Sequence, residues 1–404
     1  MDITRKGFLK SVAGAALASG LWGRVSDTFA EAKEISSATP RQTRLADLEV
    51  FPFSMEAKEV IRIALGTVST ENVLVRLRTA DGLVGWGESS PYAAVTGDTQ
   101  ATNVAAAKQL AGIVRGKDPF DLARIITEMD AATTGEPGIK AALEMAIWDI
   151  CGKLAGRPVR CLLGNYRDSF ETDLTVFLDD PSIMAEKAQS VVDRGFKTIK
   201  VKLGESAAVD IERMRSVREK VGKSVKIRID ANQGWTPNEA VRALKGIDQY
   251  NVQFCEQPVP YWDWEGMKFV RNHSPIPIMA DESVHSPHDA IEAVRREAVD
   301  MINIKLMKAG GILQAAWIAQ IAGAADMNCM LGCMSETRVA LTAAAQVVCS
   351  QRNVLYADLD AFTIHKIDPV IGGMQVKDGI IRLSATPGLG LDIDPDWLKT
   401  LHVA

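Results

Sequence analysis

The sequence predicts an α/β protein in which a closed parallel barrel follows a smaller α+β domain. Two patterns carry this prediction. After Leu162, short apolar runs rich in β-branched residues recur at even intervals, with helical patterns between them. Before it, from about Arg44, strand patterns come first and helical patterns follow. The chain has 404 residues, 47% hydrophobic and 24% charged, which is long enough for two units with large cores.

Residues 1–32 have the layout of a signal peptide. Three basic residues precede a modestly apolar stretch, SVAGAALASGLW, and an A-x-A cleavage pattern follows at Ala30-Glu31-Ala32. The run from Thr4 to Lys10 resembles a twin-arginine export signal with Arg-Lys in place of Arg-Arg, so this route and the Sec route both stay open. We expect an exported, periplasmic mature protein. The alternative is an amphipathic N-terminus without a fold.

The composition argues against nucleic acid and membrane as binding partners of the mature protein. The net charge of -5 provides no basic field for nucleic acid. No uninterrupted apolar run is long enough to span a bilayer in the mature protein. The 6 cysteines show no zinc-type spacing, and we expect Cys255 and Cys329 to be buried free thiols. The oligomeric state stays open, with a homo-oligomer as one option.

The first folded unit, residues 43–160, is predicted to be α+β. The stretch ENVLVRLRTADGLVGWGES is typical of a hairpin that turns at Asp81-Gly82. The stretch IKAALEMAIWDICGKLAG, Ile139 to Gly156, has the apolar periodicity of a helix.

The second unit, residues 161–375, is predicted to be the barrel. Its apolar runs begin at Asp173, Thr198, Lys226, Val252, Pro277, Met301, Asn328 and Tyr356. Strand–helix units of such even length favour a closed parallel barrel. A doubly wound open sheet is the alternative, but no glycine-rich dinucleotide fingerprint follows any of the runs. We expect residues 376–404 to return to the first domain.

Carboxylates gather where these runs end, which is where parallel barrels carry their chemistry. Asp230, Glu256 and Asp281 end three successive runs. If they converge they repel one another unless a cation compensates, and a set of oxygen ligands without histidine or cysteine suits Mg²⁺ better than Zn²⁺. Each residue alone is more often a cap or a surface ion pair, so the prediction rests on the set.

Lysines end two other runs. Lys200 and Lys202 point to the same side of one strand, and Lys305 ends a strand on the other side of the predicted metal site. Lys202 and Lys305 could therefore flank a ligand. A lysine near a cation and another lysine has a lowered pKa and can act as a base near neutral pH, with Lys200 supplying part of that effect.

Five motifs together resemble the enolase superfamily, in its muconate-lactonizing subgroup. They are K-V-K at 200–202, D-A-N at 230–232, E-Q-P at 256–258, A-D-E-S at 280–283 and N-I-K-L-M-K-A-G-G at 303–311. The resemblance covers nearly the whole mature chain. It implies an N-terminal α+β capping domain that closes over a modified TIM barrel, (β/α)7β.

The resemblance also implies roles for individual residues. One Mg²⁺ per subunit would bind Asp230, Glu256 and Asp281, supported by Asn232 and Glu282. Lys202 and Lys305 would be the acid–base pair, and Lys308, one turn beyond its strand, is the competing lysine. The shared chemistry is removal of a proton next to a carboxylate, with the metal and Lys200 stabilising the negative charge. A base on each face allows epimerisation.

Asp358 and Asp360, which are separated by Leu359, indicate the class of substrate. Two carboxylates on one face of the last strand suit a ligand ammonium group. This D-x-D looks like the dipeptide epimerases of the subgroup, and Thr175 matches a substrate-contacting position there. A solvated strand end is the alternative. The resemblance therefore implies an isomerase that inverts the second residue of L-Ala-Xaa dipeptides, which are its predicted small-molecule partners.

The identity of Xaa depends on the loop IRIALGTVSTENV. Epimerases acting on L-Ala-Glu typically place an arginine in this loop, whereas this chain has Gly66 there. We therefore expect an apolar or broad preference set by pocket shape, with Arg62 as the alternative anchor for an acidic residue. The segment GCMSET, Gly332 to Thr337, is expected to line the same pocket.

Several competing functions stay open. An epimerase specific for L-Ala-D/L-Glu would share the metal-binding, acid–base and ammonium-binding residues and would use Arg62 in place of the loop arginine. A muconate-type cycloisomerase or an o-succinylbenzoate synthase would use the same metal and lysines, but would leave Asp358 and Asp360 without a partner. An exported non-catalytic peptide-binding protein would not need a base on each face. A purely structural barrel would not gather so many ionisable groups at one rim.

Overall fold

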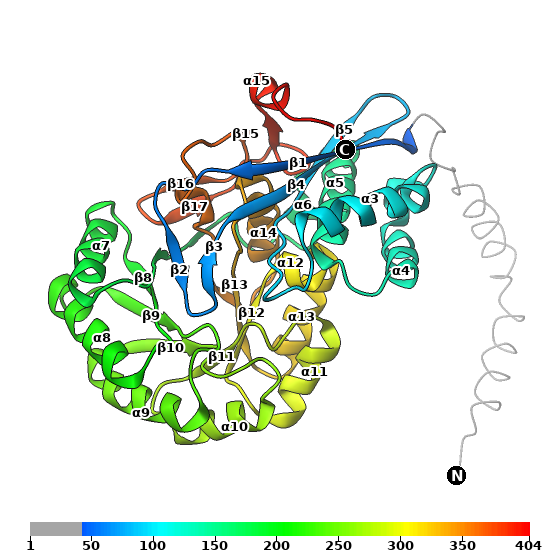
Figure 1. Cartoon of the computed structure of the whole chain (residues 1–404). Coiled ribbons are helices and arrows are strands. Elements are labelled where there is room, and N and C mark those ends of the chain that lie inside the picture. Colours follow the sequence, from blue (N-terminus) through cyan, green and yellow to red (C-terminus); the bar gives the residue numbers. More distant parts are fainter. Residues whose placement is uncertain (1–42) are drawn as a thin grey trace, which may run out of the picture.

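The computed structural model describes residues 43–404, and the predicted signal segment 1–32 lies outside the described residues. An N-terminal α+β unit lies across one end of a parallel barrel (Figure 1). No helix in the described part of the chain is long and apolar enough to cross a membrane.

The N-terminal unit is a three-stranded antiparallel sheet packed against helices. In the sheet, β4 (Thr70–Thr79) lies between β1 (Leu45–Met55) and β5 (Val84–Ser89). The helices are α3 (Gln100–Val114), α4 (Leu122–Ala132), α5 (Pro137–Ala155) and the short α6 (Val159–Leu162). The predicted hairpin and the predicted long helix are both confirmed, as β4–β5 and α5.

Strand β5 lies directly on α5. A Cβ atom on Gly87 would sit 1.8 Å from the carbonyl oxygen of Ala142, so only glycine allows this approach. Alternate apolar residues of β4, Val73, Val75 and Leu77, are buried in the core shared with these helices. The close packing of β5 on α5 therefore fixes the position of the last residues of β5.

The barrel sheet has eight parallel strands in chain order (Figure 1). They are β7 (Leu174–Val176), β8 (Thr198–Lys202), β9 (Lys226–Asp230), β10 (Val252–Glu256), β11 (Ile278–Ala280), β12 (Met301–Ile304), β13 (Asn328–Leu331) and β14 (Val354–Ala357). Its end strands meet where Asp173 N donates to Ala357 O at 3.3 Å and Leu359 N donates to Thr172 Oγ1 at 3.0 Å.

Each of the first seven strands is followed by a helix, and the eighth is not. The helices are α7 (Pro181–Asp193), α8 (Ala207–Val221), α9 (Pro237–Ile247), α10 (Trp264–His273), α11 (Pro287–Arg296), α12 (Leu306–Ala309), α13 (Ile312–Ala324) and α14 (Arg338–Ser350). The short α12 precedes α13 in the same connection. The predicted (β/α)7β barrel with an N-terminal capping domain is confirmed.

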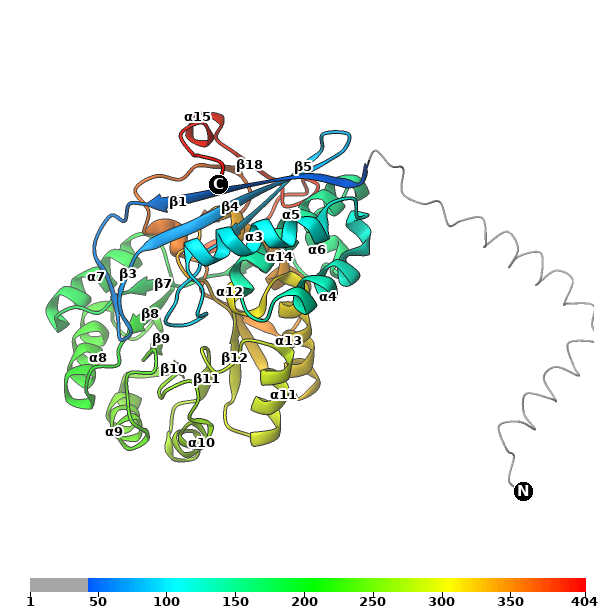
Figure 2. The ribbon, with the colours of Figure 1, turned by 45° about the vertical axis from the view of Figure 1, so that its right-hand side comes forward.

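A second hairpin reaches from the capping domain over the open end of the barrel. Its strands are β2 (Ile61–Ile63) and β3 (Gly66–Val68), and they pair only with each other in the described sheets. Figure 2 shows it between the capping sheet and the barrel strands. The hairpin therefore covers the rim at which the predicted site residues end their strands.

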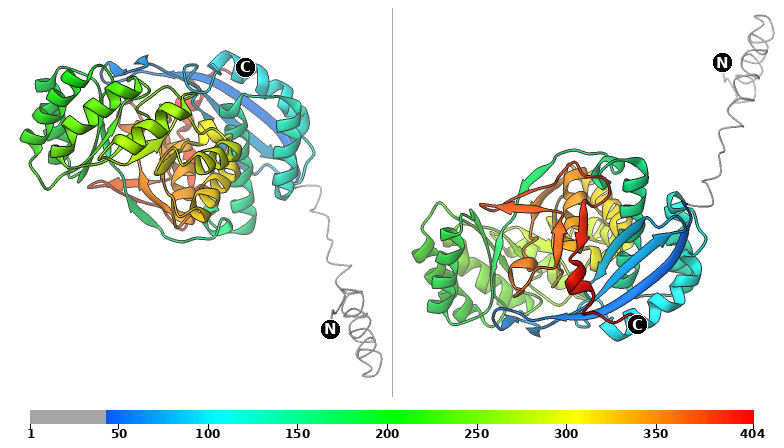
Figure 3. Two further views of the ribbon diagram at one scale, coloured as in Figure 1. Left: turned by 90° about the horizontal axis from the view of Figure 1, so that it is seen from below. Right: turned by 90° about the horizontal axis from the view of Figure 1, so that it is seen from above.

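The last part of the chain returns to the capping domain, as Figure 3 shows from above. Its elements are β15 (Val370–Gly372), β16 (Gln375–Lys377), β17 (Ile380–Arg382), β18 (Leu391–Ile393) and α15 (Pro395–Leu398), and β17 pairs with β6 (Ser169–Glu171). Trp86 Nε1 donates to Asp392 Oδ1 at 2.8 Å, and the rings of Phe53 and Trp397 pack edge to face. These contacts tie residues 376–404 to β1 and β5.

All six cysteines are free thiols, and Cys255 and Cys329 are buried, as predicted.

The inside of the barrel holds an ion pair away from the rim. Arg228 Nη1 lies 2.8 Å from Asp173 Oδ2, with 4% and 0% of the two side chains exposed. The guanidinium also lies over the rings of Phe254 and Tyr356. Burial and Asp358 raise the pKa of Asp173 well above its ordinary value and Arg228 acts to lower it, so the charge of Asp173 depends on Arg228.

We predict that Arg228→Leu lowers stability by about 3–5 kcal/mol, because it leaves the Asp173 carboxylate buried without its cation. The matched control is Arg215→Leu, which removes an arginine paired with Glu212 and Glu219 on the exposed face of α8 and should cost less than about 1 kcal/mol. Urea unfolding followed by circular dichroism measures both. Equal losses in the two variants would contradict the prediction.

Candidate active site

Lys200 lies at the centre of the rim. Its Nζ is 2.7 Å from Asp358 Oδ2, 2.8 Å from Glu256 Oε2 and 3.1 Å from Asp230 Oδ2, and the side chain is 1% exposed. Burial acts to lower the pKa of Lys200, but the Asp358, Glu256 and Asp230 carboxylates outweigh it and hold the pKa well above its ordinary value. Lys200 is therefore a fixed positive charge.

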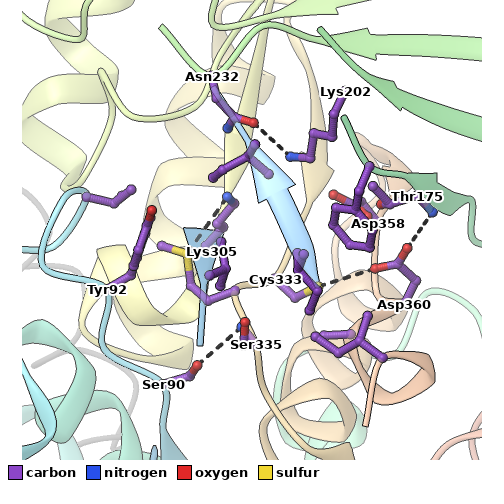
Figure 4. A pocket seen from close by; sticks show the side chains of 18 of the residues that line it. Ser90, Tyr92, Thr175, Lys202, Asn232, Lys305, Cys333, Ser335, Asp358 and Asp360 are labelled. Atoms are coloured by element: carbon purple, nitrogen blue, oxygen red, sulfur yellow. Dashed lines mark hydrogen bonds between the residues drawn. The ribbon is translucent and has the colours of Figure 1, made fainter. Parts of the chain in front are cut away.

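Lys202 and Lys305 line one cavity from strands that three others separate (Figure 4). Lys202 Nζ donates to Asp230 Oδ2 at 2.7 Å and to Asn232 Oδ1 at 3.0 Å. Lys305 Nζ lies 2.7 Å from Asp281 Oδ2. Both predicted acid–base lysines thus face the same space, each beside a carboxylate predicted to bind the metal.

Lys308 takes a different position. Its Nζ lies 2.6 Å from Asp281 Oδ1 and donates to Asn303 O at 3.1 Å. Both partners belong to the barrel wall, and Lys308 is not among the residues that line the cavity. The structure therefore separates the two competing lysines, with Lys305 at the cavity and Lys308 behind Asp281.

The lowered lysine pKa stays a prediction for the cation-bound site, and without a bound cation the carboxylates set the pKa of Lys305. Burial acts to lower the pKa of Lys305, but Asp281 and Glu256 outweigh it and raise the pKa above its ordinary value. The neighbouring carboxylates contribute more charge than Lys200 offsets. The lowered pKa belongs to Lys308, where burial outweighs the attraction of Asp281.

The three predicted metal ligands are buried carboxylates at the ends of adjacent strands. Glu256 Oε2 and both oxygens of Asp281 are within ion-pair distance of lysines but lack a well-directed hydrogen bond. Burial and the charge of Asp230 raise the pKa of Glu256 to about 8, which shows how strongly these groups compete for positive charge. This donor set fits a hard cation such as Mg²⁺.

The carboxylate oxygens of Asp230, Glu256 and Asp281 do not form a group in which all ligand atoms lie within 4.8 Å of one another. Among residues 43–404, the three metal-ligating side chains whose atoms all lie within 4.8 Å of one another are Cys333, Asp358 and Asp360. The ammonium groups of Lys200 and Lys305 lie against the predicted ligands instead.

Asn232 and Glu282 lie beside the carboxylates that are predicted to bind the metal. Asn232 Nδ2 donates to Glu282 Oε1 at 3.1 Å, and its backbone N–H donates to Asp230 Oδ1 at 2.8 Å. Both residues line the cavity. Burial and the charge of Asp281 raise the pKa of Glu282 to about 7. Asn232 therefore links Lys202, Asp230 and Glu282 in one network.

The wall of the cavity across from Lys305 is formed by Asp358, Asp360 and Thr175 (Figure 4). Thr175 N donates to Asp360 Oδ2 at 2.6 Å, while Asp358 Oδ1 is buried without a hydrogen-bond partner. Burial acts to raise the pKa of Asp358, but Lys200 and Lys202 outweigh it and lower it to about 2. Burial and then Asp358 raise the pKa of Asp360 to about 6. Asp358 is thus the more firmly ionised of the pair.

Gly66 is not among the residues that line the cavity. It follows the turn of the β2–β3 hairpin, opposite Ile63, and is exposed with φ of 118°, and a Cβ there would meet nothing within 4 Å. Arg62 also points elsewhere and lines a separate surface depression with Glu205 and Arg213. The hairpin residues that do line the cavity are Ile61, Ile63 and Val68.

Sequence reasoning missed much of the remaining wall. The capping domain supplies Ser90, Tyr92 and Val95, and the barrel supplies Phe177, Ile364 and residues 333–335. Only the last group was expected, through GCMSET. The period-two pattern of Ile61 and Ile63 is the signal that could have found the hairpin residues.

Comparisons with known proteins agree with this architecture. Residues 47–164 match the mandelate racemase / muconate lactonizing enzyme N-terminal domain, and residues 183–397 match the enolase C-terminal domain-like family. The hydrophobic dipeptide epimerase of Enterococcus faecalis is 40% identical over 351 residues, 86% of this chain and 99% of that protein. The L-Ala-D/L-Glu epimerase of Bacillus subtilis is 39% identical over 353 residues, 86% of this chain and 96% of that protein.

A solved structure is similar throughout. The dipeptide epimerase of Cytophaga hutchinsonii, complexed with Mg and D-Ala-L-Val, has a TM-score of 0.87 and 36% identity, and the match covers 89% of this chain and 98% of that one. A capping domain over a (β/α)7β barrel with this rim defines an enolase-superfamily enzyme. The chain belongs to the mandelate racemase / muconate lactonizing enzyme family of that superfamily. It is an isomerase of the epimerase type.

We predict that Mg²⁺ stabilises the folded protein, because a cation that binds only the native carboxylates shifts unfolding by mass action, about 2.7 kcal/mol at 100 times the dissociation constant. A thermal melt with and without Mg²⁺ measures the shift. Glu256→Gln should remove most of it, and Glu212→Gln on the exposed face of α8 should keep it. A Glu256→Gln shift as large as that of the unchanged protein would contradict the assigned ligand.

Proposed function

We propose that the protein is a Mg²⁺-dependent dipeptide epimerase that inverts the α-carbon of the second residue of L-Ala-Xaa dipeptides, with Xaa apolar or broad. The observation that carries the proposal is one cavity lined by Lys202, Lys305, Asp358 and Asp360. It combines two proton-transfer groups on separate strands with two carboxylates for a ligand ammonium. The dipeptides named for the similar proteins support the same substrate class.

Each side chain has a defined task in this mechanism. Asp358 and Asp360 bind the α-ammonium group of the dipeptide through charge-assisted hydrogen bonds. This anchor places the α-carbon of the second residue between Lys202 and Lys305. The lysine in its neutral form takes the α-proton, and the other, as an ammonium, returns a proton to the opposite face. The two lysines exchange roles when the reaction runs in reverse.

The charges around the lysines stabilise the reacting ligand. Lys200 is held ionised by its three carboxylates and adds a fixed positive charge at the rim. Mg²⁺ held by Asp230, Glu256 and Asp281 would supply positive charge beside the ligand carboxylate, where negative charge develops as the proton leaves. The β2–β3 hairpin covers the cavity and limits access of water.

The wall composition supports an apolar second residue. Ile61, Ile63 and Val68 face the cavity from the hairpin, and Phe177 and Ile364 face it from the barrel. The cationic side chains among the lining residues are Lys202 and Lys305, and both have catalytic tasks. An acidic side chain on Xaa would have no further cation to pair with, so shape would set the preference.

We predict that Lys202→Ala and Lys305→Ala each lower epimerisation of L-Ala-L-Leu by roughly 10²–10⁴-fold, because each removes one proton-transfer group. In heavy water, each variant should still exchange the α-proton of only one epimer, since the remaining lysine reaches one face. Mass spectrometry of separated epimers measures this. Lys220→Ala, on the surface of α8, is the control, and unchanged exchange of both epimers in both lysine variants would contradict the mechanism.

We predict that kcat/KM is at least about tenfold higher for L-Ala-L-Leu than for L-Ala-L-Glu, in the range that apolar pockets achieve. Ile63→Arg should shift the ratio toward glutamate by placing a cation in the wall. Thr67→Arg is the matched control, since Thr67 lies outside the cavity lining on the same hairpin. Exchange confined to L-Ala-L-Glu would contradict the side-chain preference. No exchange with any dipeptide would favour a cycloisomerase.

A further inference from the structure

We propose that Cys333, Asp358 and Asp360 form a second cation site inside the cavity, selective for a thiophilic divalent ion of the Zn²⁺ class. The Sγ atom and one oxygen from each carboxylate all lie within 4.8 Å of one another. This set is separate from the oxygen-only carboxylates of β9 to β11. Nothing in the epimerase mechanism requires a thiol at this position.

The sheet brings these three residues together. Strands β13 and β14 pair with Leu331 opposite Ala357, so the residues just beyond the two strand ends lie side by side. Cys333 comes from the first of these ends and the two aspartates from the second (Figure 4). The cluster is therefore fixed by neighbouring strands of the barrel.

Each aspartate has one oxygen engaged by a group outside the cluster. Asp358 Oδ2 contacts Lys200 Nζ at 2.7 Å, while Asp358 Oδ1 is buried without any hydrogen-bond partner. Asp360 Oδ2 accepts from Thr175 N at 2.6 Å, and Asp360 Oδ1 accepts weakly from Cys333 Sγ at 3.9 Å. Because Asp358 is 4% exposed and lines the cavity, its unpartnered oxygen is an incomplete coordination site.

The chemistry of this set differs from that of the magnesium ligands. One thiolate and two carboxylates, with a water as the fourth ligand, match the tetrahedral coordination of Zn²⁺. Mg²⁺ prefers oxygen ligands only, so the thiol discriminates between the two ions. On binding, the Cys333 thiol gives up its proton to solvent and its sulfur bonds the ion, so the site releases one proton per ion.

Occupancy has a consequence that rests on the proposed function. The ion would use the two carboxylates that bind the dipeptide ammonium, so the ion and the dipeptide would exclude each other. A trace thiophilic metal would then inhibit the enzyme competitively, while Mg²⁺ would not.

Cd²⁺ is the probe for this site, because cadmium thiolates absorb in the ultraviolet. In the full protein with excess Mg²⁺, a charge-transfer band should grow and saturate at one equivalent of Cd²⁺. Cys333→Ser should abolish the band, and Asp360→Asn should weaken binding at least tenfold. Cys161→Ser removes the exposed cysteine and should leave the band unchanged. No band, or a band that persists in Cys333→Ser, overturns the site.

A second measurement needs no variant. Peptide mapping after iodoacetamide treatment of the unchanged protein should show that Cd²⁺ slows alkylation of Cys333 and leaves that of Cys161 unaltered. Equal protection of both thiols, or of neither, would overturn the site even if a variant had failed to fold.

Competition separates this proposal from the proposed function. L-Ala-L-Leu should raise the apparent dissociation constant of Cd²⁺, whereas N-acetyl-L-Ala-L-Leu, which lacks the ammonium, should not. A Cd²⁺ band without competition supports the cation site and contradicts the ammonium-binding role of the aspartates. Absence of the band overturns the cation site alone, because the deuterium exchange of the lysine variants tests the epimerase independently.

Discussion

The rim of the barrel depends on the ion pairs of Lys200. An unpaired ammonium buried at this depth would cost several kcal/mol, and so would the carboxylates around it if left alone. Their contacts of 2.7 to 3.1 Å join β8 to β9, β10 and the end of β14 across the barrel interior. The strands can therefore present ionisable groups to one cavity because Lys200 balances them from the centre.

The capping domain holds this rim through carboxylates placed at helix N-termini. Glu88, at the end of β5, accepts from Thr337 N at 2.8 Å and from Thr337 Oγ1 at 2.7 Å, where α14 begins. Glu144 of α5 accepts from Leu313 N at 2.8 Å, where α13 begins. Both are buried, and burial raises the pKa of each carboxyl although the N–H groups of the helix ends act to lower it. The contacts of Glu88 with Thr337 thereby fix the end of the segment 332–337, and residues 333–335 of this segment line the cavity.

The sequence predicts the barrel and its rim well because both leave strong local signals. The even spacing of apolar runs indicates the strands, and an ionisable residue such as Asp230 at the end of a buried strand is uncommon enough to stand out. Glu88 and Glu144 carry no such signal. Each looks like an ordinary charged residue of its element, because its partners are backbone N–H groups more than a hundred residues away.

Two features required the three-dimensional structure for a different reason. The pKa of Lys305 depends on the sum of the charges around it, and a list of neighbouring residue types does not give their distances. The place of Gly66 depends on where a short hairpin turns, and Gly66 lies outside the cavity lining although it pairs with Ile63, which belongs to that lining. Electrostatic sums and hairpin register are thus less predictable than strand order.

The cavity has a polar half and an apolar half, and the two differ in how well they tolerate amino-acid substitutions. The polar half is locked by buried ion pairs that also hold the strands, so a substitution of Lys200 or Asp358 removes a structural contact together with a chemical one. The apolar half comes in part from the β2–β3 hairpin, whose strands pair with each other and whose Arg62 O accepts from Leu178 N of the barrel at 3.0 Å. Side chains on the hairpin can therefore change the shape of the cavity while the ion-paired rim stays in place.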